Sequence, residues 1–460
     1  MENFWDFKVW GGLNLFTILL LSLLFANMIK RSVSFLRNSL IPTSVLGGIL
    51  LLIASAIFKG FTGNDLLEID FFGGNGIANM EIITYHTLAL GFIASSFKTS
   101  NDKLTKQRTV EIFNTGVTTV STYLLQAVVG FGITIIAALI IADFFPAAGI
   151  LLPFGFGQGT GQALNYGTIY ETQYGFAGGK SFGLTIAALG FLSASFGGVA
   201  HLFLLKKRGK VIIRTEGEGA LSSEQVQGSN EIPMQGSMDK MTVQVALIAA
   251  AYSLSYLLMN VLGGLLPGMR SVIFGFNFLL GVLTATLVKL VIGKLQQKGL
   301  VHRQYINNFL MTRASNFFFD IMVVAGIAAI RLDVLERYWG IMLILGVVGL
   351  VITYAYNRFV AVKLFPHYVE EQFLMMYGML TGTASTGVIL LREIDGDFKS
   401  PAADNMVYQN FPAIVFGFPM MLLATLAPQQ PILTLIILVL FFIAMNILLF
   451  RSFIFKKRAR

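Results

Sequence analysis

The sequence predicts an all-α polytopic membrane protein made of two inverted five-helix repeats with re-entrant or broken segments, plus an extra C-terminal span. Three observations lead to this fold class. Of the 460 residues, 55% are hydrophobic and only 12% are charged, whereas soluble domains carry about 25% charged residues. Apolar segments of about 20 residues, the length that a bilayer requires, follow one another along the chain. Two glycine-rich polar stretches interrupt this apolar pattern, one in each half.

Eleven apolar segments are long enough to cross a membrane. The first five are predicted at roughly 9–29, 44–60, 79–97, 112–141 and 176–205. Five more are predicted at roughly 241–263, 272–294, 307–330, 339–358 and 404–427, and the extra one at roughly 431–450. This order divides the chain into a first repeat at 1–205, a linker at 206–240, a second repeat at 241–427, and a final span with a basic tail at 428–460.

The distribution of basic residues predicts the orientation. With the N-terminus outside, the loops expected inside hold most of the lysines and arginines, including Lys206-Lys207-Arg208 and the C-terminal tail. The net charge of +9 is explained in this way without a nucleic-acid partner. We therefore expect a multi-pass protein of the cell (inner) membrane, in contact with the lipid bilayer, with its C-terminus and the 206–240 linker in the cytoplasm.

The same rule constrains the two interruptions, at roughly 146–172 and 371–392. If the first of them crossed the membrane fully, every later loop would change sides and the positive-inside rule would fail. Each interruption is therefore expected to enter and leave on one side, or to break a single span. An odd number of spans in each half then makes the two repeats inverted, an architecture typical of secondary transporters.

The interruptions are the predicted binding site. Glycine lets backbone groups approach a ligand closely, and the neighbouring amides and hydroxyls add donors and acceptors. Exposed amides at the N-termini of half-helices attract a carboxylate, and freed carbonyls and hydroxyls suit a hard cation such as Na⁺. Close packing of small residues between helices is the alternative interpretation. The residues predicted to bind the substrate are Gln158, Gly159, Thr160, Gly161, Gln162, Thr381, Gly382, Thr383, Ser385 and Thr386.

A carboxylate within an apolar span is the second candidate for the coupling ion. Asp320 lies in the middle of the span at 307–330, and Asn316, four residues earlier, shares its helical face. A charged side chain at the membrane centre costs about 2.5–3.5 kcal/mol on insertion scales. A bound Na⁺, a proton, or pairing with Arg313 would offset this cost. A coupling-ion site and a structural pair both remain open.

Several of these residues resemble a known family. The run Ser32 to Leu36, followed by Ile41-Pro42, resembles the start of the sodium/glutamate symporters, and Gly157 to Gly161 is similar to their glycine-rich signature. The resemblance covers roughly residues 10–425 and implies sodium-coupled import of glutamate through two inverted repeats. Phe156 and Gln158 stand where the family signature commonly has glycine and histidine, so the substrate could be another small anionic amino or carboxylic acid.

Other classes of function are less consistent with the sequence. There are no cysteines, which excludes disulfides and thiol catalysis, and no hydrolase or metalloprotease motif is present. We therefore expect no enzymatic activity and no cofactor other than Na⁺ as the coupling ion. An ion channel, or a cation-coupled carrier for a different small organic anion, are the alternatives. The oligomeric state, with a homodimer as one option, is left open.

Overall fold

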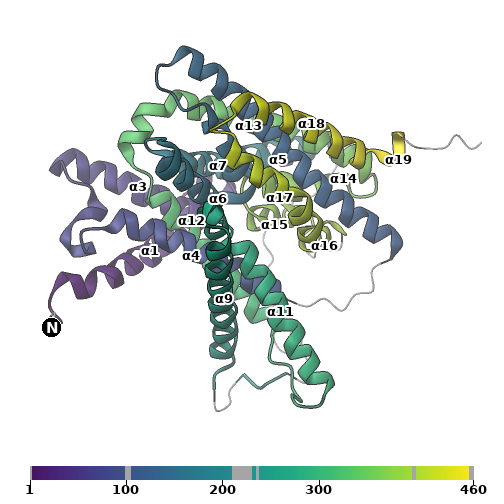
Figure 1. Ribbon diagram of the computed structural model, residues 1–460, viewed down its shortest axis with the longest axis horizontal. Coiled ribbons are helices and arrows are strands. Elements are labelled where there is room, and N and C mark those ends of the chain that lie inside the picture. Colours follow the sequence, from purple (N-terminus) through teal and green to yellow (C-terminus); the bar gives the residue numbers. More distant parts are fainter. Residues whose placement is uncertain (1–2, 99–104, 210–230, 235–237, 396–399, 455–460) are drawn as a thin grey trace, which may run out of the picture. The chain divides into compact units, whose positions relative to one another are not determined.

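The fold is that of a computed structural model, which describes residues 3–98, 105–209, 231–234, 238–395 and 400–454 (Figure 1). Every regular element in these residues is a helix. Ten of the described helices are long and apolar enough to cross a membrane, or eleven if a bent pair counts as one more span. The prediction of an all-α polytopic protein is confirmed at this level.

Ten of the eleven predicted spans each correspond to one long helix. In the first half these are α1 (Phe7–Ser32), α3 (Thr43–Thr62), α4 (Gly76–Phe97), α5 (Lys106–Ile140) and α7 (Gly179–Lys207). In the second half they are α9 (Lys240–Leu265), α11 (Asn277–Gln297), α12 (Asn308–Ala328), α13 (Leu332–Leu364) and the extra span α18 (Pro431–Leu449). The predicted span at 404–427 is a pair, α16 (Ala402–Tyr408) and α17 (Asn410–Leu426), bent by 53°.

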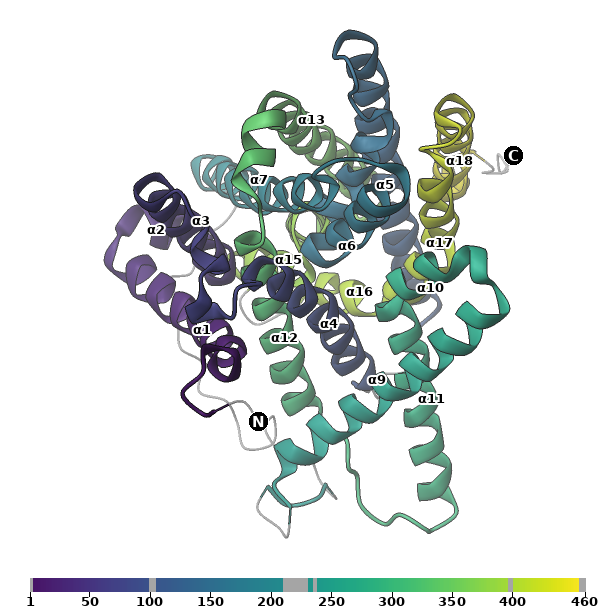
Figure 2. The ribbon, with the colours of Figure 1, turned by 60° about the vertical axis from the view of Figure 1, so that its left-hand side comes forward.

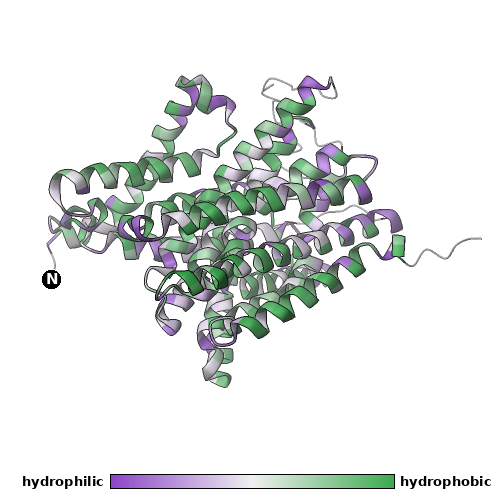
Figure 3. Ribbon diagram, turned by 90° about the horizontal axis from the view of Figure 1, so that it is seen from above, coloured by the Kyte–Doolittle hydropathy of each residue, from purple (hydrophilic) through white to green (hydrophobic). Residues whose placement is uncertain are grey.

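The remaining elements are short helices and the two interruptions. The interruptions are α6 (Leu151–Tyr174), and α14 (Val369–Thr381) with α15 (Ala384–Arg392). The short helices are α2 (Ser34–Asn38), α10 (Arg270–Gly275) and α19 (Arg451–Ile454). Single 3₁₀ turns lie at Leu66–Glu68, Asp70–Phe72, Pro146–Ile150 and Pro267–Met269. Hydrophobic residues run along the helices, while hydrophilic ones gather at helix ends and connections (Figure 3), as expected of segments that cross a bilayer.

The chain forms two compact units that do not follow its division into halves. The first contains Met1–Ile77, Leu104–Thr215 and Gly326–Arg460, and the second contains Ala78–Lys103 and Glu216–Ala325. The two predicted repeats are defined by the order of the spans along the chain, whereas these units are defined by which residues pack together. The units therefore do not test the repeats, and the division into repeats stays a prediction. Both interruptions belong to the first unit.

The second unit consists of most of α4 and α12 together with α9, α10 and α11. In this unit α9 and α11 lie side by side (Figure 2). Its core contains Phe97 from α4 and Ile248 from α9. Most of the predicted 206–240 linker lies outside the described residues. Its described end is anchored in this unit, because Glu231 accepts hydrogen bonds of 2.7 Å from both Lys240 Nζ and Asn307 Nδ2. Lys240 is only 1% exposed, so its charge needs this partner.

Candidate functional site

The first interruption folds into a helical hairpin whose turn is at Gly159. This glycine has φ 79° and ψ −173°, a backbone conformation essentially restricted to glycine, and helix continues on both sides of it. The ring of Phe154, in the first arm, stacks on the ring of Tyr166, in the second, with centroids 3.8 Å apart. The two arms of α6 therefore lie side by side and run in opposite directions.

The second interruption is also a hairpin, formed by α14 and α15 with its turn at Gly382 and Thr383. A Cβ atom added to Gly378 would lie 2.9 Å from the Cα atom of Gly387, and one added to Gly387 would lie 2.5 Å from Met375 O. The two arms therefore touch through their backbones. Side chains larger than glycine at these two positions would force the arms apart.

The tips of the two hairpins meet beside Gly190 of α7. A Cβ atom at this position would lie 2.5 Å from Thr381 O and 3.1 Å from the Cα atom of Phe156. One residue from each hairpin thus lies against the same point of α7, with Gly382 and Phe191 packed next to it. At each tip a first arm ends, where helical carbonyls lack partners, and a second arm begins, where helical amides lack partners. Donors for an anion and acceptors for a cation are therefore concentrated in one place.

The structure places most of the predicted substrate residues at these tips. Thr160, Gly161 and Gln162 are buried in the first turns of the second arm of α6, and Gln158 is half-buried before the turn. In the second hairpin, Thr381, Gly382 and Thr386 are buried and Thr383 is half-buried. The Thr383 and Thr386 hydroxyl oxygens are 3.5 Å apart. The side chain of Ser385 lies outside the described residues.

Gln162 has the most unusual environment among these residues. Its side chain is 0% exposed, yet neither its Nε2 nor its Oε1 has a hydrogen-bond partner among the described residues. The Nε2 atom of Gln158 is likewise buried and unpartnered in the described part of the chain. A buried polar group without a partner costs about 1–3 kcal/mol, so in a native protein it calls for a water, an ion or a ligand to bind it. Two such amides on either side of Gly159 leave hydrogen-bonding capacity for a polar ligand at the first tip.

Three further residues, Gln126, Thr353 and Tyr123, contact the tips and were not predicted. Gln126 of α5 donates from Nε2 to Leu380 O, next to the second tip, at 3.0 Å and to Thr353 Oγ1 of α13 at 2.8 Å. Tyr123 of α5 donates to Gly157 O, next to the first tip, at 3.0 Å. The amide of Gln126 in the middle of an apolar span was the available signal, because buried polar residues in spans are usually functional.

Asn316 and Asp320, the predicted Na⁺ ligands, lie on α12 within the second compact unit. Both side chains are exposed. They are four residues apart on one helical face, as predicted. No group of three or more histidine, cysteine or acidic residues within the described ranges is arranged to hold a metal ion. A role for these two residues in sodium binding stays a prediction.

A half-buried charge cluster fixes the base of the second hairpin to its neighbours. Glu370 accepts hydrogen bonds from Arg358 Nη1 at 2.7 Å and Nη2 at 2.9 Å, and from His201 Nε2 at 2.9 Å. Burial raises the pKa of the Glu370 carboxyl, but the hydrogen bonds and charges of His201 and Arg358 outweigh it and lower the pKa to about 2. The cluster links α7, α13 and α14, so the hairpin enters the core of the unit from a fixed position.

No protein-family model matches the sequence, and no curated protein matches it either. The functional argument therefore depends on the two hairpins and the residues around their tips.

Proposed function

We propose that this protein is a secondary active transporter that imports glutamate, or a related small anionic amino or carboxylic acid, together with Na⁺ by alternating access. The observation that carries the proposal is the meeting of the two hairpin tips at Gly190, with the unpartnered amide of Gln162 buried beside one of them. Paired discontinuous helices that bring their ends together are the usual binding site of secondary transporters.

The anion would bind at the start of the second arms. There the free helical amides of α15 and of the second arm of α6 carry the positive ends of two helix dipoles. The amide of Gln162 and the hydroxyls of Thr160 and Thr383 add neutral donors near the same backbone. Neutral donors fit an anion that must be released again, since a buried lysine or arginine would hold a carboxylate more tightly.

The coupling cation would bind at the end of the first arms. Leu380 O, Thr353 Oγ1 and the side chain of Gln126 already meet within hydrogen-bond distance, and the Gln126 Oε1 atom is buried without a partner in the described residues. A rotation of this amide would present its oxygen beside the other two, and such oxygens are the ligands that hard cations prefer. Asn316 and Asp320 remain the alternative ligand set.

The proposal includes the inverted-repeat relationship and the orientation. Each half of the chain holds one hairpin before its last span, as two inverted five-helix repeats require. The resemblance of Gly157 to Gly161 to the sodium/glutamate symporters supports the choice of family. We place the protein in the cell membrane with its N-terminus outside, because the basic loops then lie in the cytoplasm.

Energetics supports coupling to a cation. Moving one charge through 100 mV is worth about 2.3 kcal/mol, and an inside-negative potential opposes import of an anion. One Na⁺ for each monovalent anion makes the cycle electroneutral, and a second lets the potential drive import. An ion channel remains the second candidate, although the two inequivalent hairpins favour a carrier.

Counterflow in proteoliposomes tests the function. Vesicles loaded with one unlabelled amino or dicarboxylic acid should accumulate the labelled acid only if the protein carries it, and only with Na⁺ present. Vesicles containing Gly190→Ala protein serve as the matched control. Conductance far above carrier turnover would instead favour a channel, and accumulation without Na⁺ would favour a different coupling ion.

A further inference from the structure

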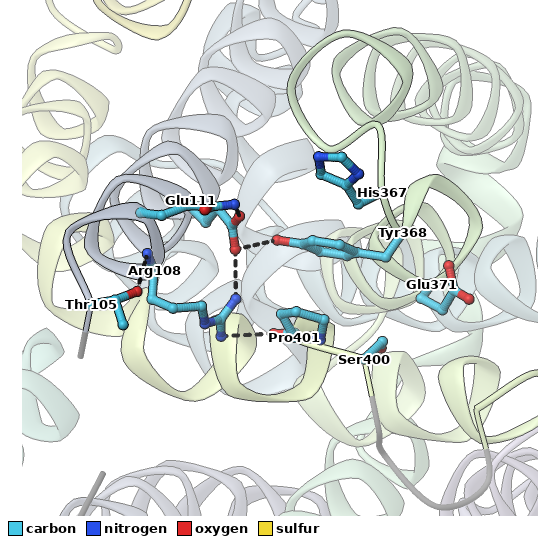
Figure 4. Close-up of a pocket in the computed structure, with 9 residues that line it drawn as sticks. Thr105, Arg108, Glu111, His367, Tyr368, Glu371, Ser400 and Pro401 are labelled. Carbon is cyan, nitrogen blue, oxygen red and sulfur yellow. Dashed lines mark hydrogen bonds and ion pairs between the residues drawn. The ribbon is translucent and has the colours of Figure 1, made fainter. Parts of the chain in front are cut away.

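A second polar region of the first unit lies at the base of the second hairpin. A cavity of about 420 Å³ opens between the start of α5, the start of α14 and the residues before α16. Glu111 lies between Arg108 and Tyr368 at this cavity (Figure 4). Its Oε2 atom accepts from Arg108 Nη1 at 2.7 Å and from the hydroxyl of Tyr368 at 2.8 Å.

A chain of hydrogen bonds continues from this cavity into the protein. Asn405 Nδ2 donates to the Tyr368 hydroxyl at 3.0 Å and to Gln372 Oε1 at 3.1 Å. Gln372 Nε2 donates in turn to Thr115 Oγ1 at 3.1 Å. Asn405, Gln372 and Thr115 are all 0% exposed. The Asn405 Oδ1 atom has no partner within the described ranges, so the chain retains unused polar capacity in a buried place.

Helix α5 extends this polar character to the binding tips. Five of its polar residues recur at helical spacing on one face, so they form a stripe. This stripe, which we call the α5 polar stripe, consists of Glu111, Thr115, Thr119, Thr122 and Gln126. Fifteen residues of helix span about 22 Å, and the last member, Gln126, bonds to Leu380 O beside the second tip. The stripe therefore begins at the cavity and ends at the tip.

We propose that the cavity at Arg108, Glu111 and Tyr368 is the mouth of a water-accessible route that runs along the α5 polar stripe to the hairpin tips. The bonds between Glu111, Tyr368, Asn405, Gln372 and Thr115 close the route in this conformation, and their separation opens it to small hydrophilic solutes. The identity of the solutes, an anion and its coupling cation, rests on the proposed function, whereas the existence of the route does not.

The absence of cysteine from the sequence permits a direct test. Single variants Thr115→Cys, Thr119→Cys and Thr122→Cys form a series of increasing depth along the stripe. Purified variants are placed in vesicles of known orientation and exposed, from either side, to a small membrane-impermeant methanethiosulfonate. A thiol must be reached by water to react, so reactivity measures opening of the route.

Val120→Cys is the matched control. Val120 lies on the same helix at 0% exposure, but faces Gly417 of α17 instead of the stripe. We expect each stripe variant to react about tenfold or more faster than Val120→Cys, only from the side of Thr105, and more slowly with increasing depth. Stripe variants that react no faster than Val120→Cys would overturn the proposal and assign the threonines to helix packing.

If the cysteine variants fail to fold, a measurement on the wild-type protein still tests the route. Met379 directly precedes Leu380, whose carbonyl oxygen accepts from Gln126 at the end of the stripe, while Met342 of α13 is 1% exposed and serves as control. Hydroxyl-radical oxidation should modify Met379 severalfold faster than Met342, and equal rates would contradict the route. Neither test uses a substrate. Fast labelling of the stripe cysteines without sodium-dependent glutamate binding would support the route and contradict the proposed substrate. Sodium-dependent glutamate binding without fast labelling would support the proposed function and contradict the route.

Discussion

The ring of Phe154 stacks on the ring of Tyr166 at a centroid distance of 3.8 Å and an interplanar angle of 9°. A continuous helix would hold these two residues about 18 Å apart. The contact is possible only because the chain reverses at Gly159, and this reversal places the start of a helix beside the end of another, deep inside the unit. The position of the tip, and with it the proposed site, depends on that single glycine.

Gly159→Ala should disrupt the first hairpin. Alanine would have to adopt φ 79° with ψ −173°, a conformation that costs about 1–3 kcal/mol for residues with a Cβ atom. We expect a lower unfolding temperature and loss of substrate binding. Gly132→Ala is the control, because Gly132 lies within α5 with open space around its Cβ position. That change should be neutral or slightly stabilising, and equal effects of both substitutions would contradict the assigned turn.

Gly190→Ala should separate the two tips. Its methyl group would lie 2.5 Å from Thr381 O, a backbone atom that cannot rotate away. Overpacking of this kind costs about 1–3 kcal/mol. Substrate affinity should fall about tenfold or more, while Gly340→Ala on α13, where a Cβ meets nothing within 4 Å, should bind normally. Isothermal titration of the two variants checks this, and normal affinity of Gly190→Ala would show that the tips do not form one site.

Gln126→Leu should weaken the attachment of the second tip. The substitution removes the donor to Leu380 O and to Thr353 Oγ1, leaving two buried acceptors with fewer partners, at a cost of about 1–3 kcal/mol. Thr353→Val removes one of the same bonds. A double-mutant cycle on unfolding free energy should therefore give a coupling of about 0.5–3 kcal/mol. Strict additivity would mean that the two side chains act independently.

The long helices could be predicted from the sequence because length and hydropathy alone decide which segments suit a bilayer. The predicted span at 112–141 is the core of α5, and that at 431–450 is α18 almost residue for residue. The two interruptions could also be located from local composition, and Gly159 and Gly382, where the structure has its turns, lie within these polar stretches. These features depend only on residues close together in the sequence.

The surroundings of the tips could not be predicted in the same way. Gln126 and Leu380, or His201 and Glu370, are far apart in the sequence, and no local pattern joins them. Asn316 and Asp320 show the converse limit. Their spacing on one helix was correctly read, but it does not say which unit of the protein they join. Only the packing of α12 with the second unit settles that.

The charge cluster at Glu370 predicts a dependence of stability on pH. Its pKa in the folded protein is about 2, below the ordinary value of 4.5. A lowered pKa stabilises the fold fully above about pH 4.5, and this contribution is lost as the pH falls towards 2. Thermal unfolding in detergent between about pH 6 and pH 3 should therefore show a shallower decline for Glu370→Gln than for the wild type.

Glu336→Gln is the control for this series, because Glu336 lies exposed near the start of α13. Its curve should follow that of the wild type. If Glu370→Gln also follows the wild type throughout, the hydrogen bonds from His201 and Arg358 do not stabilise the folded protein.

The central claim is that one site at the two hairpin tips binds an anion and Na⁺ together. It is tested most directly by equilibrium binding of glutamate to the purified protein over a series of Na⁺ concentrations. Two ligands that share a site raise each other's affinity by the same factor. The account predicts that glutamate affinity rises with Na⁺, and that Thr160→Val and Thr383→Val, which each remove a hydroxyl at a tip, weaken the apparent affinity for glutamate, Na⁺ or both. Glutamate affinity that is unchanged between zero and saturating Na⁺, together with wild-type binding by both variants, would contradict the site and the coupling at once.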